Sequence, residues 1–142
     1  PIRSMWSGMK VYALRGAVQL EADSSEEMDK AVARLITEIM AKNRLAARNL
    51  VHVTFSQTSD LASANPATSL RRHGLHSAPL FCVQEPAYPE SLPRTLRILI
   101  LCRASFWSRA FWTRPKHCYL GGARALRPDL AEVPPSEKSA NR

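Results

Sequence analysis

The chain has 142 residues, of which 45% are hydrophobic, a length and composition that suit one domain with a single core. Its 20 Lys and Arg residues against 12 Asp and Glu give a formal net charge of +8, which favours an anionic substrate or partner; the sequence has neither a zinc-finger spacing nor an aromatic-rich RNA-binding signature. Three cysteines with no close pair argue against a disulfide framework and fit a cytoplasmic protein, and no apolar run reaches the roughly 20 residues of a membrane span.

The first third of the chain predicts a strand followed by a long helix. Residues 1–8 precede Met9, a plausible natural start, and are interpreted as upstream sequence. Residues 11–14 predict a short strand that ends at Arg15-Gly16. Over residues 25–42, apolar side chains recur at spacings of three and four, and a capping-box pattern stands at the start, so this segment predicts an amphipathic helix.

The rest of the chain predicts mostly strands. In chain order, we expect a strand over 51–55, a helix from Asn65-Pro66 to about Gly74, a strand over 79–84, a proline-rich loop, a strand over 95–103 and a short strand over 118–120. Together these elements predict an α+β fold, a mixed β-sheet with helices on one face. We expect one domain over residues 9–130 and a flexible tail over residues 131–142.

Residues 103–116 are rich in aromatic and basic side chains. The aromatic residues are Phe106, Trp107, Phe111 and Trp112. We expect a hairpin or loop that buries these rings against its own subunit, because aromatic side chains usually bury. The alternative is an exposed contact patch.

One arginine stands in an apolar strand. Arg97 interrupts a run of Leu and Ile, and in a regular strand its side chain points away from Leu96 and Ile98. A buried guanidinium is costly unless an anion meets it, so Arg97 is either a ligand-binding residue or a rim arginine paired with a structural carboxylate. The histidines and cysteines show no recognised metal-ligand spacing, and we predict no metal site.

Six short motifs carry a family resemblance. They are, in order, Leu14-Arg15-Gly16-Ala17, Asn65-Pro66-Ala67-Thr68-Ser69-Leu70-Arg71, Cys82-Val83-Gln84-Glu85, Leu92-Pro93-Arg94-Thr95-Leu96-Arg97, His117-Cys118-Tyr119-Leu120 and Leu126-Arg127-Pro128-Asp129-Leu130. Their order and spacing, from about Val11 to Leu130, resemble the trimeric, barrel-like (AroH-type) class of chorismate mutases rather than the all-helical class. The resemblance implies a homotrimer forming a pseudo α/β-barrel, with an active site at each subunit interface and no cofactor.

The resemblance also implies residue roles in converting chorismate to prephenate, for phenylalanine and tyrosine synthesis. Arg97 would lie beside the breaking ether bond, Glu85 would contact the substrate hydroxyl, and Arg15 would bind a carboxylate or the ether-oxygen side. Tyr119 would hydrogen-bond a carboxylate. The further substrate-binding residues implied are Asn65, Ala67, Thr68, Arg71, Cys82, Leu126 and Arg127.

Two departures from the family pattern leave alternatives open. Asn65 stands where phenylalanine is usual, and Thr68 where lysine is frequent. They keep open a second hypothesis, a non-catalytic or altered-specificity trimer that binds a dicarboxylate. A third hypothesis is a basic trimer that binds nucleic acid through residues 103–116. The leading expectation is an active chorismate mutase that binds neither nucleic acid nor membrane.

Overall fold

A computed structural model describes residues 8–130. The interpretation of residues 1–8 as upstream sequence, apart from Gly8, and of 131–142 as a flexible tail therefore lies outside the described residues. The elements are β1 (Met9–Gln19), α2 (Ser25–Lys42), η1 (Ala47–Asn49), β2 (Leu50–Gln57), α3 (Pro66–Arg72), β3 (Leu80–Gln84), β4 (Thr95–Ser105), η2 (Arg109–Trp112), β5 (Cys118–Leu120), η3 (Gly121–Leu126) and η4 (Pro128–Leu130), where η denotes a 3-10 helix.

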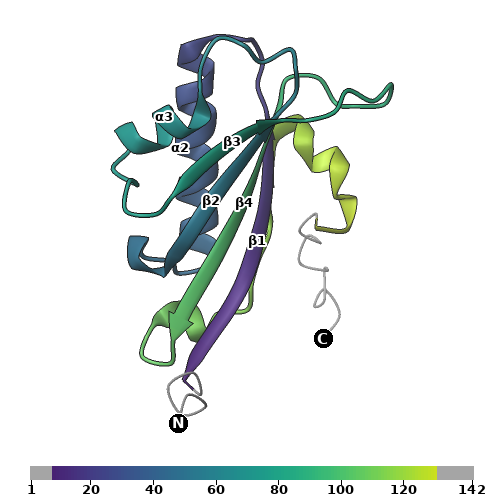
Figure 1. Cartoon of the computed structure of the whole chain (residues 1–142). Helices are drawn as coiled ribbons and strands as arrows, with labels where there is room; N and C mark the ends of the chain where they lie inside the picture. Colours follow the sequence, from purple (N-terminus) through teal and green to yellow (C-terminus); the bar gives the residue numbers. More distant parts are fainter. Residues whose placement is uncertain (1–7, 131–142) are drawn as a thin grey trace, which may run out of the picture.

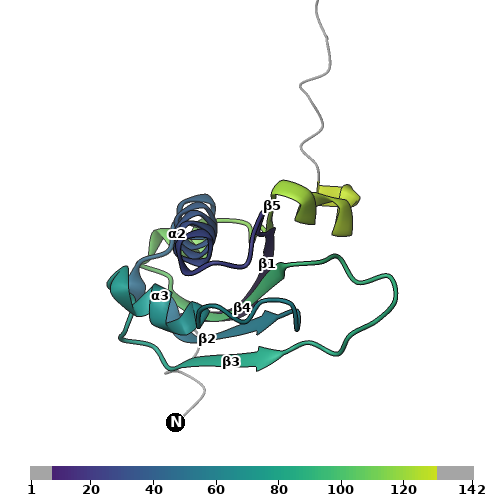
Figure 2. The same cartoon turned by 90° about the horizontal axis from the view of Figure 1, so that it is seen from above.

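The strands form one five-stranded sheet in the order β3-β2-β4-β1-β5; Figure 1 labels the first four of these, and Figure 2 labels β5 beside β1. β4 pairs antiparallel with both β1 and β2, whereas the outer pairs β1–β5 and β2–β3 are parallel. Figure 2 shows the sheet curving around α2, with α3 on the same side. The predicted α+β fold, a mixed sheet with helices on one face, is therefore confirmed.

The helix α2 supplies the helical side of the core. It begins where the Ser24 side chain accepts a hydrogen bond from the backbone N–H of Glu27 at 3.1 Å, as a helix N-cap does. Its buried stripe consists of Met28, Ala31, Val32, Leu35, Ile36 and Ile39. This stripe belongs to the same apolar cluster as the inward side chains of the strands, among them Leu14, Phe55 and Ile100. The predicted bounds of this helix are confirmed.

The strand predicted to end at Arg15-Gly16 is longer than expected, because β1 continues to Gln19. Gly16 lies where β1 comes closest to its neighbours. A Cβ at this position would lie 2.7 Å from the carbonyl oxygen of Cys118 and 3.1 Å from Cδ1 of Leu35. Glycine inside a strand often marks such a close approach rather than a strand end.

The expectation that residues 103–116 bury their aromatic rings is wrong for both tryptophans. Trp107 is 85% exposed and Trp112 is 73% exposed. Their rings contact neighbouring aromatic rings instead of the core: the centroids of Phe106 and Trp107 are 4.2 Å apart, and those of Phe111 and Trp112 are 5.0 Å apart. The Trp112 indole N–H donates to the carbonyl of Phe106 at 2.7 Å, which closes the turn with the ring outside.

Asn43 connects the end of α2 to the segment that leads into β5. The side chain is 1% exposed. Its amide donates to the carbonyls of Ile39 and Lys116, both at 2.8 Å, and its oxygen accepts from the N–H of Lys116 at 2.7 Å. One buried amide therefore fixes the backbone just before His117 and β5.

We expect Asn43→Ala to lower the free energy of unfolding by about 2–3 kcal/mol, because it leaves the N–H and C=O of Lys116 without their buried partner. Urea unfolding followed by circular dichroism measures the loss. Lys42→Ala, at the exposed neighbouring position, should change stability by no more than about 0.5 kcal/mol. Equal stability of Asn43→Ala and the wild type would contradict this role.

Candidate active site

The face of the sheet that the helices leave uncovered carries the predicted site residues Arg15, Glu85, Arg97 and Tyr119. Cross-strand partners share one face of a sheet. One row of partners runs from Val83 through Ser56, Arg97 and Ala17 to Tyr119. The next row joins Phe81, Thr54, Leu99 and Arg15. The register alone thus places Arg15, Arg97 and Tyr119 on one face.

Arg97 forms an ion pair with Glu85. Leu96 and Ile98 are buried in the core, so the intervening Arg97 points to the open face, as the strand pattern predicts. Its Nε lies 2.6 Å from Oε1 of Glu85, and the two side chains are 33% and 18% exposed. The Ser56 hydroxyl donates to the same carboxylate oxygen at 3.1 Å. Glu85 holds this place because its N–H donates to the carbonyl of Gln57 at 2.8 Å, just beyond the end of β3.

The start of β4 is held by the residue before it. Arg94 has a left-handed backbone, with φ of 47°. Its N–H donates to the carboxylate of Asp60 at 2.9 Å, and its Nε donates to the carbonyl of Leu20 at 3.0 Å. These bonds determine where β4 begins and therefore on which face Arg97 lies.

A hollow of about 420 Å³ lies on the open face. Its lining residues are Arg15, Gly16, Thr54, Ser56, Arg97, Ile98, Leu99 and Tyr119. The volume is in the range of small-molecule sites, which are roughly 300–1,000 Å³. Two guanidinium groups and a phenol beside apolar walls can hold a compact anion that also has apolar surface.

Arg127 lies at the side of Tyr119. Its guanidinium carbon is 5.8 Å from the centroid of the Tyr119 ring. Its Nε and one terminal nitrogen donate to the two carboxylate oxygens of Asp129 at 2.9 and 2.8 Å. This hydrogen-bonded pair raises the pKa of Arg127 and lowers the pKa of Asp129, so both remain charged at neutral pH. The predicted site residue Leu126 directly precedes Arg127 and is half-buried.

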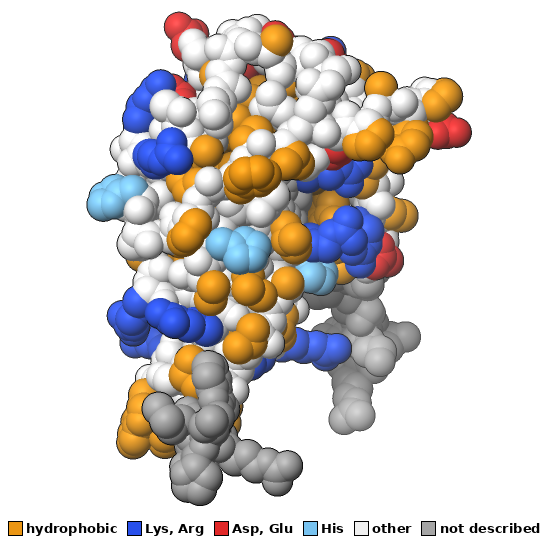
Figure 3. Space-filling model, viewed as in Figure 1, with side chains coloured by type: hydrophobic (Ala, Val, Ile, Leu, Met, Phe, Trp, Pro, Cys, Tyr) orange, Lys and Arg blue, Asp and Glu red, His pale blue; other side chains and the backbone are white. Residues whose placement is uncertain are grey.

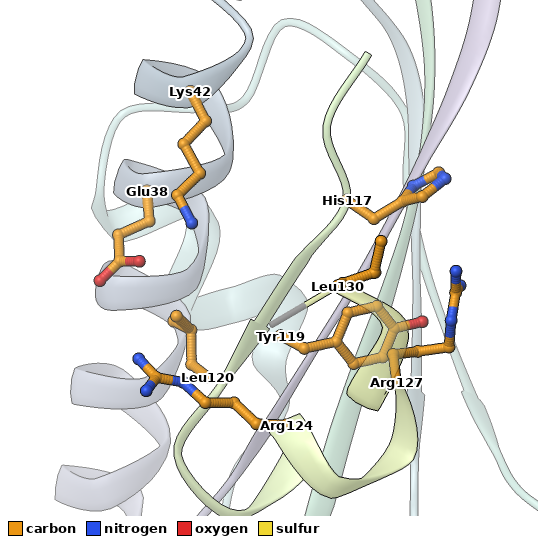
Figure 4. Close-up of a pocket in the computed structure, with 8 residues that line it drawn as sticks. All are labelled: Glu38, Lys42, His117, Tyr119, Leu120, Arg124, Arg127 and Leu130. Atoms are coloured by element: carbon orange, nitrogen blue, oxygen red, sulfur yellow. The ribbon is translucent and has the colours of Figure 1, made fainter. Parts of the chain in front are cut away.

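A second hollow, of about 440 Å³, lies between α2 and the C-terminal turns (Figure 4). Its lining residues are Glu38, Lys42, His117, Tyr119, Leu120, Arg124, Arg127 and Leu130. Tyr119 borders both hollows. We place the candidate active site in the hollow on the open face, because Arg97 and Arg15 line that hollow and neither lines the second one.

Another group of predicted site residues lies on the opposite side of the sheet. Asn65, Ala67, Thr68 and Arg71 belong to α3 or its N-cap, and α3 is held against α2 by the Arg72–Asp29 ion pair of 3.1 Å. Cys82 pairs with the buried Phe55 and shares its inward face. One chain therefore brings together Arg15, Glu85, Arg97, Tyr119 and Arg127, but not the residues of α3 or Cys82.

The structure adds two residues that the sequence analysis did not propose. Ser56 contacts Glu85, and an alternating strand pattern continued by one residue could have placed it on the open face. His117 accepts a hydrogen bond at Nδ1 from the backbone N–H of Arg15 at 3.0 Å. No local pattern indicates that contact, because 102 residues separate the two positions.

The three thiols are unsuited to nucleophilic catalysis. Burial raises the pKa of the Cys102 thiol to about 11 and also raises the pKa values of Cys82 and Cys118. The thiolate is the reactive form, so at neutral pH these side chains are protonated. Across residues 8–130, no group of three or more His, Cys, Asp and Glu side chains is placed to hold a metal ion. In the same range, neither α2 nor α3 has the length and apolar character needed to cross a bilayer.

The fold and the hollow define a class of protein: a mixed sheet that presents fixed arginines and one carboxylate to a small anion. Comparison with known proteins identifies the class further. Residues 11–130 match the family described as chorismate mutase type I. The chain belongs to this family.

Two curated relatives carry the name chorismate mutase AroH. The one from Thermus thermophilus is 36% identical over 121 residues, which cover 84% of this chain and 96% of the relative. The one from Bacillus subtilis (strain 168) is 27% identical over 124 residues, covering 87% of this chain and 94% of the relative. A solved structure of a chorismate mutase from Clostridium thermocellum is similar with a TM-score of 0.70 and 29% identity, covering 80% of this chain and 98% of that one.

We expect the buried Cys102 and Cys118 of the native protein to react with iodoacetamide at pH 7.5 at least about 100-fold more slowly than free cysteine, since burial both shields these thiols and raises their pKa values. The half-buried Cys82, whose pKa is also raised, should react more slowly than free cysteine too. The rate should rise as the pH approaches the raised pKa values. Mass spectrometry of the alkylated protein gives the rates, and the urea-unfolded chain, in which all three thiols should react fast, is the control. One rapidly labelled cysteine in the folded protein would contradict the proposed absence of a reactive thiol.

Proposed function

We propose that this protein is an isomerase that converts chorismate to prephenate, a step in the synthesis of phenylalanine and tyrosine. The observation that carries the proposal is the 2.6 Å contact between Arg97 and Glu85 on a sheet face that also presents Arg15 and Tyr119. Membership of the chorismate mutase type I family supports it. We further propose that the protein acts in the cytoplasm and uses no cofactor.

The reaction explains why the site contains cations but no activated nucleophile. In chorismate, one C–O ether bond breaks while a C–C bond forms within the same molecule, so no proton, nucleophile or second substrate is needed. The protein must hold the compact conformer of the substrate, which is an effect of orientation. It must also stabilise the negative charge that develops on the ether oxygen.

Arg97 is the proposed donor to that oxygen. Its ion pair with Glu85 holds the guanidinium in place before the substrate arrives, so little reorganisation is needed as the charge develops. Glu85 is itself oriented by Ser56, and we propose that its other oxygen accepts from the substrate hydroxyl. Arg15 and Tyr119 line the same hollow and are the proposed contacts for the substrate carboxylates.

The alternative, a binder without catalysis, loses one of its two supports. Asn65 is the N-cap of α3: its side-chain oxygen accepts from the N–H of Ala67 at 2.9 Å. A side chain that caps a helix has a structural reason to differ from phenylalanine. Thr68 remains a departure with no comparable local explanation, and it is half-buried.

We also propose that the chain assembles as a homotrimer with an active site at each interface. The uncovered face carries Val11, Phe81, Val83 and Leu99, which are 60%, 67%, 40% and 41% exposed. In Figure 3, apolar side chains lie exposed over the strands beside a cluster of Lys and Arg side chains. A contiguous exposed apolar face usually marks an interface. In such a trimer, the α3 residues of a neighbouring subunit would complete the active site around Arg97, which the α3 residues of the same chain do not reach.

Arg97→Ala should lower kcat for chorismate by about 100- to 1,000-fold or more, because it removes a donor that acts on the developing charge. Arg97→Lys should also have a low kcat, since one ammonium group cannot reproduce the planar guanidinium with its fixed N–H donors. A neutral hydrogen-bonding replacement should have a lower kcat than the lysine variant, because it lacks the positive charge. The loss of chorismate absorbance measures the rate. Arg48→Ala, at an exposed position in η1, is the control. Near-normal turnover by Arg97→Ala would refute the assignment.

Phe81→Lys should weaken the trimer, because it places a charge on the apolar face that we propose is buried on assembly. Light scattering coupled to size-exclusion chromatography should show a trimer for the wild type and smaller species for the variant, with activity that recovers at higher protein concentration. Trp107→Lys removes an even more exposed aromatic ring, outside this face, and should leave the trimer intact. A monomeric, fully active wild type would contradict the proposed assembly.

A further inference from the structure

The backbone of Arg15 pairs with Leu99 of β4 on one side, but on the other side a side chain holds it instead of a strand. Arg15 lies on β1 beside the short edge strand β5, and β5 begins only at Cys118, opposite Gly16. The N–H of Arg15 therefore reaches beyond the start of the β1–β5 ladder. It donates to Nδ1 of His117 at 3.0 Å. The imidazole nitrogen takes the place of the carbonyl that a longer strand would have offered.

We infer that His117 is a positioning residue of the active site: its unprotonated Nδ1 holds the backbone of Arg15 and so aims the Arg15 guanidinium at the substrate. This inference rests on the proposed function, since it assigns His117 to the site in which Arg15 binds chorismate. His117 itself does not line the hollow that contains Arg97 and Arg15.

The bond requires one protonation state. A neutral imidazole has one nitrogen that donates and one that accepts, so an accepting Nδ1 places the proton on Nε2. In the imidazolium, both nitrogens donate, and Nδ1–H would then face the N–H of Arg15. Protonation of His117 therefore breaks the bond and sets two donors against each other.

The charged and titratable groups around His117 come from four elements or turns. They are Arg15 on β1, Tyr119 on β5, Arg124, Arg127 and Asp129 in the C-terminal turns, and Glu38 and Lys42 on α2. All of these except Arg15 and Asp129 line the same hollow as His117. Burial of the imidazole, followed by the charges of Arg127 and Arg15, lowers the pKa of His117 from its usual 6.5, while Asp129 acts in the opposite direction. The ring is thus neutral at pH 7, the state that the hydrogen bond requires.

The position of the imidazole is fixed from its other side. The preceding residue, Lys116, is bonded through both its N–H and its C=O to the buried side chain of Asn43, at 2.7 and 2.8 Å. Next in the chain, Cys118 is fully buried and begins β5. The support therefore runs from the end of α2, through Asn43 and His117, to the backbone of Arg15.

A pH profile separates this role from simple packing. The rearrangement transfers no proton, and substrate carboxylates of ordinary acidity titrate near pH 3–4, well below the range of histidine. We expect kcat/KM of the wild type to fall about tenfold as the pH is lowered through the depressed pKa of His117, the loss that corresponds to one hydrogen bond. KM should change more than kcat, because the proposed role of Arg15 is to bind substrate in both the ground and transition states.

The test compares three variants over pH 5 to 9. His117→Asn keeps an acceptor at the position of Nδ1 but cannot be protonated, so it should retain wild-type kcat/KM at pH 8 and lose the fall at low pH. His117→Leu has no acceptor and should show a KM about tenfold higher at every pH. His76→Asn, at an exposed position outside the site, should keep the wild-type profile. Thermal unfolding of each variant at pH 5 and pH 8 distinguishes a changed site from a lost fold.

If kcat/KM of His117→Asn still falls at low pH as it does in the wild type, the inference is wrong. Unchanged kcat and KM in His117→Leu would also overturn it. Should His117→Leu fail to fold, the profile of His117→Asn still decides. Nitrogen-15 NMR of the histidine side chains, assigned with His117→Asn, adds a readout independent of turnover: at pH 8 His117 should carry its proton on Nε2. If the wild type shows no turnover, the proposed function fails, and the NMR result alone decides whether the bond to Arg15 exists.

Discussion

The burial of only one face of the sheet is the constraint on which the rest of the structure depends. The apolar stripe of α2 covers the face formed by Leu14, Phe55, Ile98 and Ile100. Because side chains alternate along a strand, the neighbouring residues must point the other way. The polar and charged residues Ser56 and Arg97 therefore lie on the uncovered face, where cross-strand pairing places them in the same row as Tyr119. A shift of one residue in β4 would exchange Arg97 for a leucine.

The electrostatics of that face suit a small anion held in a fixed pose. A guanidinium in a partly buried place needs an anionic partner, and Glu85 supplies one at 2.6 Å. Arg15 adds a second cation to the same hollow, so the charges of Arg97, Glu85 and Arg15 together leave this part of the face positive. In contrast, the thiols nearest to the core are protonated because burial raises their pKa values. Such a site can orient a substrate and stabilise developing charge, which is what the proposed rearrangement requires.

The support of the site reaches well beyond the residues that line it. Asp60 and Arg94 hold the beginning of β4, and Asn43 holds the segment before β5. The first contact joins β4 to the loops that follow β1 and β2, and the second joins the segment before β5 to the end of α2. The same open face is apolar away from the arginines, and one chain leaves the α3 residues on the other side of the sheet. Both features support the proposed assembly, in which one subunit completes the site of another.

Much of the architecture follows from local patterns in the sequence. The stripe of α2, the N-caps at Ser24 and Asn65, and the alternation around Arg97 are each set by residues a few positions apart, so they could be predicted. The motif set also indicated the family to which the chain belongs.

Tertiary structure decided the rest. Gly16 could not be recognised as mid-strand, because the reason for a glycine there is the approach of Cys118 and Leu35. The contacts of Glu85 with Arg97 and of His117 with Arg15 depend on strand order and register, which bring together residues far apart in the sequence. Local preferences decide which segments form helices and strands and which side each buries, but only the packing of the whole chain decides which charged side chains meet.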